Sequence, residues 1–170
     1  MKKLLLMMSL TLSILVISCS DNGTEPVDEE GLNLLITPSE QTVTVNSEVT
    51  FSVQIENVSD LFAFSGEIVF DSTKVSIPEN PVTEGDFWTS DLISTSQNEA
   101  DRLCVTIGLV QTEEEDGIDG DGILFSFKLI GFAVGESDLT FENLYLIDED
   151  SELVDNFNEI EITNGKVIIQ

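Results

Sequence analysis

The sequence predicts an all-β protein that folds as a two-sheet β-sandwich. Between residues 32 and 170, several runs alternate apolar and polar residues at a period of two. Glycine, asparagine, aspartate and proline residues separate these runs, as expected for turns between strands. No window has the 3.6-residue periodicity of a convincing amphipathic helix. Because every second side chain of a strand lies on the same face, each run can bury one face against a second sheet.

The first half of the domain contains four predicted strand regions. Strands are expected at residues 32–37, which end at Pro38, and at 43–46. The run 49–56 alternates without error, and its predicted inward residues are Val49, Phe51, Val53 and Ile55. After a predicted turn at 57–60, the run 61–70 directs five further residues inward, namely Phe62, Phe64, Gly66, Ile68 and Phe70.

The second half continues the pattern after residues 78–100, the least regular segment, for which a loop with short strands or one helical turn is expected. The run 102–110 has the predicted inward residues Leu103, Val105, Ile107 and Leu109. A glycine turn at 120–122 precedes the run 123–132, whose predicted inward row is Ile123, Phe125, Phe127 and Leu129. The opposite row mixes apolar and polar residues, which indicates that this strand is covered on both sides. Further strands are expected at 139–147, 160–162 and 167–169, the last two flanking a turn at 163–165.

The N-terminus has the features of an export signal. Residues 1–18 combine two lysines, an apolar run too short to span a membrane and a small residue, Ser18, before Cys19. Residues 16–19 resemble the lipobox of bacterial lipoproteins, which implies that Cys19 is lipidated and becomes the new N-terminus. The alternative is an ordinary signal peptide with an incidental cysteine. Residues 19–30 form an acidic tether, and residues 31–170 form the domain.

The residue that follows Cys19 predicts where the protein is located. Ser20 follows the cysteine, and resemblance to Gram-negative lipoproteins then favours sorting to the outer membrane. We therefore expect an exported protein that is anchored by lipid to the outer membrane or the cell surface.

The charge and the cysteine content exclude several classes of function. The chain has 33 acidic and 6 basic residues, and two of the basic residues belong to the leader. Nucleic acids and anionic membrane surfaces would be repelled by this charge. If Cys19 carries lipid, Cys104 is the only remaining thiol, so no internal disulfide can form. Cys104 is expected to pack within a strand, because the chain has no histidine to activate it.

No cofactor, metal site or catalytic site is predicted. Asp116, Asp119 and Asp121 resemble part of an EF-hand loop, but the register would place Gly117 and Lys128 at the two end positions, which require carboxylates. This segment is therefore interpreted as a solvated hairpin turn, and the acidic segment 148–152 lacks the required glycine. The chain has neither a phosphate-binding glycine loop nor a nucleophile elbow. A binding protein is predicted rather than an enzyme.

The order of short motifs resembles the cohesin domain, the module with which bacterial scaffoldins capture dockerin-bearing proteins. The motifs are Phe-Asp-Ser-Thr-Lys-Val at 70–75, Gly-Asp-Phe at 85–87, the strand 122–128, and the segments 143–148 and 164–167. The resemblance covers residues 32–170. It implies a jelly-roll sandwich of about nine strands and a protein partner, possibly a dockerin-bearing one. The acidic insertion 113–116 has no counterpart in the family.

The resemblance also implies a partner-binding face. The runs 61–70, 103–110 and 122–132 would share the sheet that cohesins use for their partners. Their outward residues are more apolar than the outward row of 49–56, which suits an interface with an apolar centre and a polar rim. The alternative is that a loop or the N-terminal segment covers this face. The predicted face consists of Leu61, Ala63, Ser65, Cys104, Thr106, Leu124, Ser126 and Lys128.

A second binding hypothesis is a carbohydrate-binding sandwich. Such a module needs exposed aromatic rings on which sugars can stack. Phe87, Trp88 and Tyr145 are the candidates, and the phenylalanine-rich rows otherwise face inward.

Overall fold

The computed structural model describes residues 31–89, 91–111 and 116–170. The predicted signal peptide 1–18, the tether 19–30 and the lipidation site Cys19 lie outside the described residues. Residues 113–115 of the acidic insertion also lie outside them. In the described part of the chain, no helix is long and apolar enough to cross a membrane.

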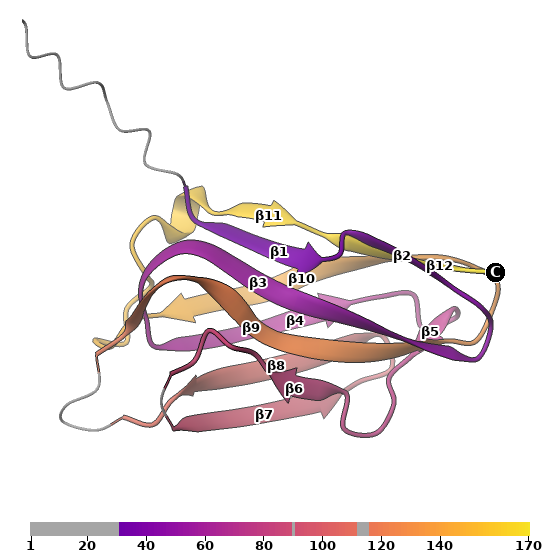
Figure 1. Cartoon of the computed structure of the whole chain (residues 1–170), viewed down its shortest axis with the longest axis horizontal. Coiled ribbons are helices and arrows are strands. Elements are labelled where there is room, and N and C mark those ends of the chain that lie inside the picture. Colours follow the sequence, from indigo (N-terminus) through magenta and orange to yellow (C-terminus); the bar gives the residue numbers. More distant parts are fainter. Residues whose placement is uncertain (1–30, 90, 112–115) are drawn as a thin grey trace, which may run out of the picture.

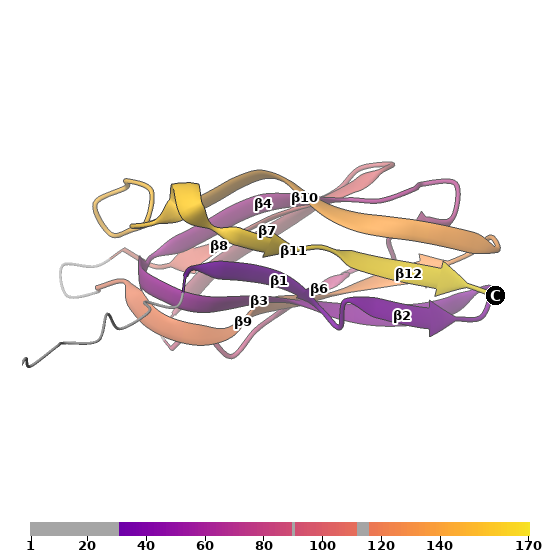
Figure 2. The ribbon, with the colours of Figure 1, turned by 90° about the horizontal axis from the view of Figure 1, so that it is seen from above.

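The described chain is a sandwich of two six-stranded sheets (Figures 1 and 2). Sheet one has the order β11-β1-β3-β9-β5, with β6 also paired to β9. Its strands are β1 (Asn33–Thr37), β3 (Ser47–Leu61), β5 (Val75–Ser76), β6 (Val82–Glu84), β9 (Ile118–Gly131) and β11 (Glu161–Thr163). Sheet two has the order β2-β12-β10-β4-β8-β7. Its strands are β2 (Glu40–Val43), β4 (Ala63–Val69), β7 (Leu92–Asn98), β8 (Arg102–Leu109), β10 (Gly135–Ile147) and β12 (Gly165–Ile169).

The prediction of a two-sheet, jelly-roll sandwich is confirmed. The described chain has twelve strands where about nine were expected, because several edge strands are only two to four residues long. A 3-10 turn, η1 (Phe157–Glu159), precedes β11. The two strands predicted to flank a turn at 163–165 lie in different sheets, since β11 pairs with β1 in sheet one and β12 pairs with β2 in sheet two.

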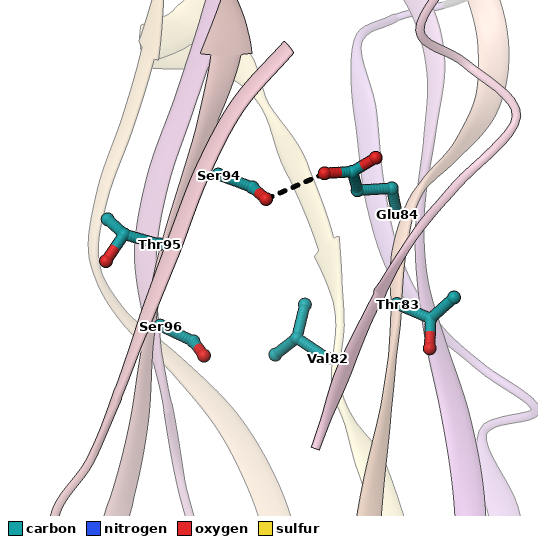
Figure 3. Close-up of a pocket in the computed structure, with 6 residues that line it drawn as sticks. All are labelled: Val82, Thr83, Glu84, Ser94, Thr95 and Ser96. Atoms are coloured by element: carbon teal, nitrogen blue, oxygen red, sulfur yellow. Dashed lines mark hydrogen bonds between the residues drawn. The ribbon is translucent and has the colours of Figure 1, made fainter. Parts of the chain in front are cut away.

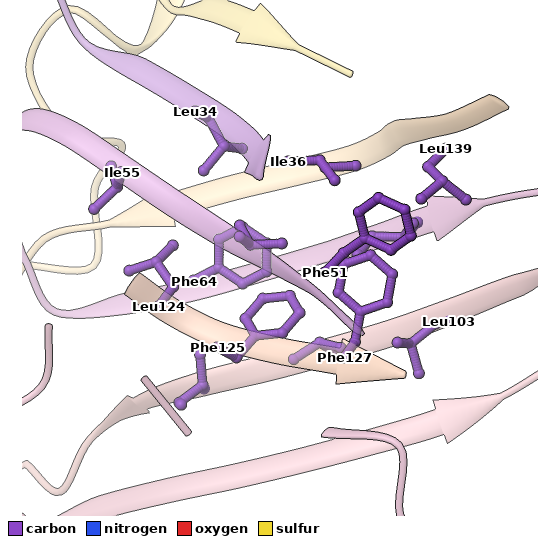
Figure 4. Close-up of a cluster of buried hydrophobic side chains, with 14 of the residues drawn as sticks. Leu34, Ile36, Phe51, Ile55, Phe64, Leu103, Leu124, Phe125, Phe127 and Leu139 are labelled. Carbon is purple, nitrogen blue, oxygen red and sulfur yellow. The ribbon is translucent and has the colours of Figure 1, made fainter. Parts of the chain in front are cut away.

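The core lies between the sheets and is centred on phenylalanine side chains (Figure 4). The Phe51 and Phe127 rings stack with centroids 5.8 Å apart, and Phe64 and Phe125 join the sheets with centroids 5.4 Å apart. Aromatic pairs at these separations add about 0.5–1.5 kcal/mol to the effect of burial. The inward rows predicted for 49–55 and 103–109 are confirmed, because all of their apolar members are buried.

Strand β9 departs from the predicted alternation. Along β3 and β9 the register shifts by one residue, so Val53 pairs with Phe125 and Gln54 pairs with Ile123. Leu124 therefore has no partner on β3 and is fully buried. This β-bulge is the physical reason that the predicted outward position of Leu124 and the predicted inward position of Ile123 are wrong.

The turn predicted at 57–60 is also wrong. Strand β3 continues to Leu61, and its register with β9 shifts twice more on the way. Leu61 pairs with Ile118 at the end of β3 and is fully buried, so it does not begin the outward row of β4. Asn57 and Asp60 have positive φ angles of 57° and 58°, a conformation that asparagine and aspartate adopt more readily than most residues. Turn-forming residues thus mark bulges within one long strand.

Candidate protein-binding face

The candidate site is the outer face of sheet two over β7, β8, β4 and β10. Strands β4 and β8 are antiparallel, and directly paired residues point to the same side of a sheet. Phe64, Ile68 and Leu103 are buried against the core, so the alternate residues point outward. The outward residues of these two strands are Ala63, Ser65, Glu67, Val69, Arg102, Cys104, Thr106 and Gly108.

Strands β7 and β10 extend this surface on both sides. Thr95 pairs with Thr106, and Tyr145 pairs with Ser65, so both belong to the same outer face. Ile93 on β7 is 64% exposed and Tyr145 on β10 is 54% exposed. We call the outward residues of these four strands the outer face of sheet two. Two exposed apolar side chains therefore lie on either side of its central strands.

The centre of the outer face is polar but well ordered. The Ser65 and Thr106 hydroxyl oxygens lie 3.0 Å apart, within hydrogen-bond distance. Arg102 donates to Glu67 at 2.6 Å and also lies near Asp101 at 3.2 Å and Glu142 at 3.6 Å. The hydrogen bonds that Arg102 donates to the Asp101 and Glu67 carboxylates raise the pKa of Arg102, and the bond to Asp101 lowers the pKa of Asp101. The cluster joins β8 to β4 and β10.

Cys104 lies on this face beside Glu67 and is partly buried. Burial raises the pKa of its thiol, and the nearby Glu67 carboxylate raises it further. A thiol with a raised pKa stays protonated at neutral pH and is a weak nucleophile. Cys104 therefore contributes packing and a weakly polar surface to the face.

The residues of the predicted partner face do not lie on one surface in the structure. Ala63, Ser65, Cys104 and Thr106 lie together on sheet two, as paired positions of β4 and β8. Leu61 and Leu124 are buried in the core and cannot contact a partner. Ser126 and Lys128 lie on β9 in sheet one, so the prediction that the three runs share a sheet is wrong. The reason is that β9 pairs with β3, whereas β4 pairs with β8 and β10.

Ser126 and Lys128 belong to the opposite surface. The hydroxyl oxygens of Ser126 and Ser52 lie 2.8 Å apart, and Lys128 pairs with Glu48 at 2.9 Å. Because β3 supplies the neighbouring residues Thr50 and Ser52, the surface around them is polar. It offers little apolar surface for a partner to bury.

Sequence reasoning missed the part of the face that β7 supplies. Residues 92–98 were placed in an irregular segment, although Leu-Ile-Ser-Thr-Ser-Gln-Asn contains neither glycine nor proline. That absence, together with the β-branched Ile93 and Thr95, was the available signal for a strand. Arg102 was assigned to the outward row, but its acidic partners come from β4 and β10 and were not predictable from local sequence.

Two of the three aromatic residues proposed for sugar stacking are buried. Phe87 is 4% exposed and Trp88 is 8% exposed, and their rings form an edge-to-face pair with centroids 5.1 Å apart. The Trp88 indole N–H donates to the Leu124 carbonyl at 2.8 Å. Tyr145 alone remains exposed, so the three residues do not form an aromatic platform.

Two of the three aspartates considered for calcium binding, Asp119 and Asp121, have structural roles. The carboxylate of Asp119 accepts a hydrogen bond from the Asp60 amide at 2.8 Å, and that of Asp121 accepts one from the Asn57 amide at 2.6 Å. These bonds satisfy amides at the bulges of β3, and Gly120 lies within β9, so the predicted hairpin turn at 120–122 is wrong. Within residues 31–89, 91–111 and 116–170, no group of three or more His, Cys, Asp or Glu side chains is arranged to hold a metal ion.

Structural comparison assigns the sandwich to the cohesin fold. The chain superimposes with a TM-score of 0.66 and 20% identity on a non-cellulosomal cohesin from the hyperthermophilic archaeon Archaeoglobus fulgidus, covering 83% of this chain and 92% of that one. A cohesin from Clostridium thermocellum, solved in a type I complex with a dockerin, gives a TM-score of 0.65 and 18% identity over 83% of this chain and all of that one.

A third cohesin extends the same result. The third cohesin of ScaC from Acetivibrio cellulolyticus, solved in complex with the ScaB dockerin, gives a TM-score of 0.65 and 17% identity. The match covers 81% of this chain and 98% of that one. No family model and no curated protein sequence matches the chain. The likeness is therefore one of fold, carried over nearly the full length of the solved cohesins.

Proposed function

We propose that this protein is a non-catalytic binding module that captures a dockerin-type protein on the outer face of sheet two. The observation that carries the proposal is the cohesin fold, found over nearly the whole length of cohesins that were solved with dockerins bound. The residues of this chain give a second reason, since the outer face of sheet two combines exposed apolar side chains with an ordered polar centre.

The outer face of sheet two is favoured over the opposite face by its composition. Ile93 and Tyr145 are exposed there, whereas the central strands of sheet one present Thr50, Ser52 and Lys128. Exposed apolar side chains supply most of the energy when an interface forms, and a surrounding polar rim supplies specificity. Tyrosine is also among the residues most enriched at interface hot spots.

The charge around the face restricts the partner. Arg102 is enclosed by Glu67, Asp101, Glu99 and Glu142, so acidic groups dominate its surroundings. Complementary potentials speed association and exclude like-charged competitors. We expect the contacting surface of the partner to carry lysine or arginine residues around an apolar centre.

The protein is proposed to act at a membrane surface. Cys19 would carry the lipid, and residues 20–30 would separate the domain from the outer membrane or cell surface. Labelling with palmitate tests this assignment, because the wild-type chain should incorporate label and Cys19→Ala should not. Equal labelling of the variant would contradict the lipid anchor while leaving the binding proposal intact.

Retention of exported proteins on immobilised domain tests the proposed binding. The wild-type domain should retain proteins with duplicated calcium loops of the dockerin type, and a calcium chelator should release them. The double variant Ile93→Lys, Tyr145→Lys should retain them poorly, because each lysine replaces an apolar contact beside the polar centre of the face with a charge.

A matched variant on the opposite face provides the control. Thr50→Lys, Ser52→Lys adds the same charge to sheet one and should retain the partner as the wild type does. Equal retention by both double variants would reject the outer face of sheet two as the binding surface. Retention of polysaccharide in place of protein would support the carbohydrate-binding alternative and reject the proposed function.

A further inference from the structure

Strand β7 has the longest open edge in the described part of the sandwich. It ends the order of sheet two and contains seven residues, whereas β2, β5, β6 and β11, which occupy the other edge positions, have two to four residues each. Very short edge strands are one way in which proteins prevent further strand pairing. The length of β7 makes its edge the one suited to pair with another chain.

The edge of β7 also lacks the other protective features. Residues 92–98 contain no charged residue and no proline, and their pairing with β8 continues without a register shift. Charged side chains, proline and bulges are the usual devices that block an open edge. Their absence is notable in a chain of which 23% is charged.

Backbone hydrogen bonds identify the groups that face outward from this edge. The Val110 amide donates to the Asp91 carbonyl, and the Glu99 amide donates to the Arg102 carbonyl, each at 3.0 Å. In an antiparallel ladder, hydrogen-bonded and non-bonded pairs alternate, so odd-numbered residues of β7 bond to β8. The amides and carbonyls of Ser94 and Ser96 consequently point to the open edge.

A polar cleft lies beside this edge, between the two sheets (Figure 3). Ser94 and Ser96 on β7 face Val82 and Glu84 on β6 across the cleft, and Thr95 points away from it. The Ser94 hydroxyl donates to the Glu84 carboxylate at 2.7 Å. The cleft has a volume of about 490 Å³. A strand added to β7 would direct every second side chain into this cleft.

We propose that the edge of β7 binds an extended segment of a partner polypeptide with lysine or arginine at alternate positions. The backbone of the segment would pair with Ser94 and Ser96, and its basic side chains would enter the cleft toward Glu84. Asp91 and Glu99 flank the strand, and no basic residue lines the cleft. This charge disfavours a second copy of the chain, which would bring the same acidic groups to the edge.

The edge site is separate from the proposed dockerin-binding function, because it uses backbone groups of β7 and side chains that point between the sheets. The probe is a nine-residue peptide of alternating threonine and lysine, titrated calorimetrically into the wild-type protein. Ser96→Pro removes one backbone donor at the edge, and Pro is tolerated at an edge position whose N–H does not serve the ladder. The net charge of the protein is unchanged, so non-specific attraction of the peptide is retained.

Ser96→Pro should weaken binding roughly tenfold, the equivalent of one lost hydrogen bond and the steric block to its neighbours. Ser96→Ala keeps the backbone donor and should bind as the wild type does. Glu84→Gln should weaken binding severalfold. A peptide that is N-methylated at alternate residues should not bind the wild-type protein, a result that does not depend on how the variants fold.

Three outcomes would overturn the proposal. Equal binding of the peptide by Ser96→Pro, or of the N-methylated peptide by the wild type, would reduce the interaction to charge alone. If the wild-type protein does not bind the peptide at millimolar concentration, the proposed edge site does not exist. A dimer in sedimentation that Ser96→Pro dissociates would identify a second copy of the chain as the occupant. Loss of dockerin-type binding in the Ile93 and Tyr145 double variant tests the outer face of sheet two. It does not affect the result for peptide binding at the edge of β7.

Discussion

Replacement of Leu124 by alanine distinguishes a core residue from an interface residue. Leu124 is fully buried at the bulge of β9, although its position in the alternation predicts an exposed, partner-binding side chain. Loss of three carbon atoms from a buried site costs about 2.4 kcal/mol in transfer free energy, at about 0.8 kcal/mol for each methylene. The cavity adds to this, so a total loss of about 3 kcal/mol is expected, within the range of about 2–5 kcal/mol for Leu→Ala.

Unfolding in urea, followed by tryptophan fluorescence, measures this loss. Trp88 is the only tryptophan, it is buried, and its indole bonds to the Leu124 carbonyl, so it reports directly on this part of the core. Ile93→Ala is the matched control, because Ile93 is exposed on the candidate face, and its free energy of unfolding should change by less than about 0.5 kcal/mol. A Leu124→Ala protein with wild-type stability and reduced partner affinity would refute the core assignment.

Three further substitutions test the packing and the electrostatics. Gly85→Ala should destabilise the fold by more than about 2 kcal/mol in urea unfolding, because the new Cβ would overlap the backbone carbonyl of Ile123; wild-type stability would contradict this close approach. Trp88→Phe should cost about 0.5–1.5 kcal/mol for the lost indole hydrogen bond, with a further loss of packing, in urea unfolding followed by far-UV circular dichroism; the Leu124 carbonyl keeps the Gly85 amide as a donor. The pKa of Asp71 is lowered, first by the hydrogen bond from the Thr73 hydroxyl and then by the one from the Thr73 amide. The ionised carboxylate therefore stabilises the fold above the unfolded pKa of Asp71, and this stabilisation is lost as the pH falls through the folded pKa. Asp71→Asn should therefore lower stability at pH 7 and flatten the loss of stability below about pH 4, as thermal melts over a pH series would show, and an unchanged acid profile would exclude this role.

The sequence predicts the strands better than it predicts their sheets. The run 49–55 alternates regularly, and all its inward residues are buried, because burial on one face imposes a period of two. Which strands become neighbours depends on pairing between distant segments. Ser52 and Ser126 face each other across β3 and β9, 74 positions apart, and no local pattern specifies that contact.

Bulges explain the remaining errors in the candidate face. One extra residue at Leu124 reverses the orientation of Ile123 and buries both Leu124 and Phe125. Three consecutive apolar residues at 123–125 were the visible sign, but such a run is also compatible with a strand that is covered on both faces. Asn57 and Asp60 predicted a turn because asparagine and aspartate tolerate positive φ angles. The same tolerance allows these residues to form bulges within a strand. The four predicted residues that do share one outer face come from the two strands with regular pairing, namely Ala63, Ser65, Cys104 and Thr106.

The two proposed sites lie on adjacent parts of β7 and divide its residues between them. Ile93 and Thr95 point to the outer face of sheet two, and Ser94 and Ser96 point into the cleft. Substitutions at odd and even positions of this strand can therefore separate binding on the face from binding at the edge.

Mapping of the bound partner by NMR tests the central claim most directly. Amide signals of the isotope-labelled domain would be followed while an identified dockerin-type partner is added. The largest changes should fall on β4, β8, β7 and β10, around Ser65, Thr106 and Tyr145, with small changes at Thr50 and Lys128. Changes concentrated on β3 and β9 would place the partner on sheet one and contradict the proposed binding face.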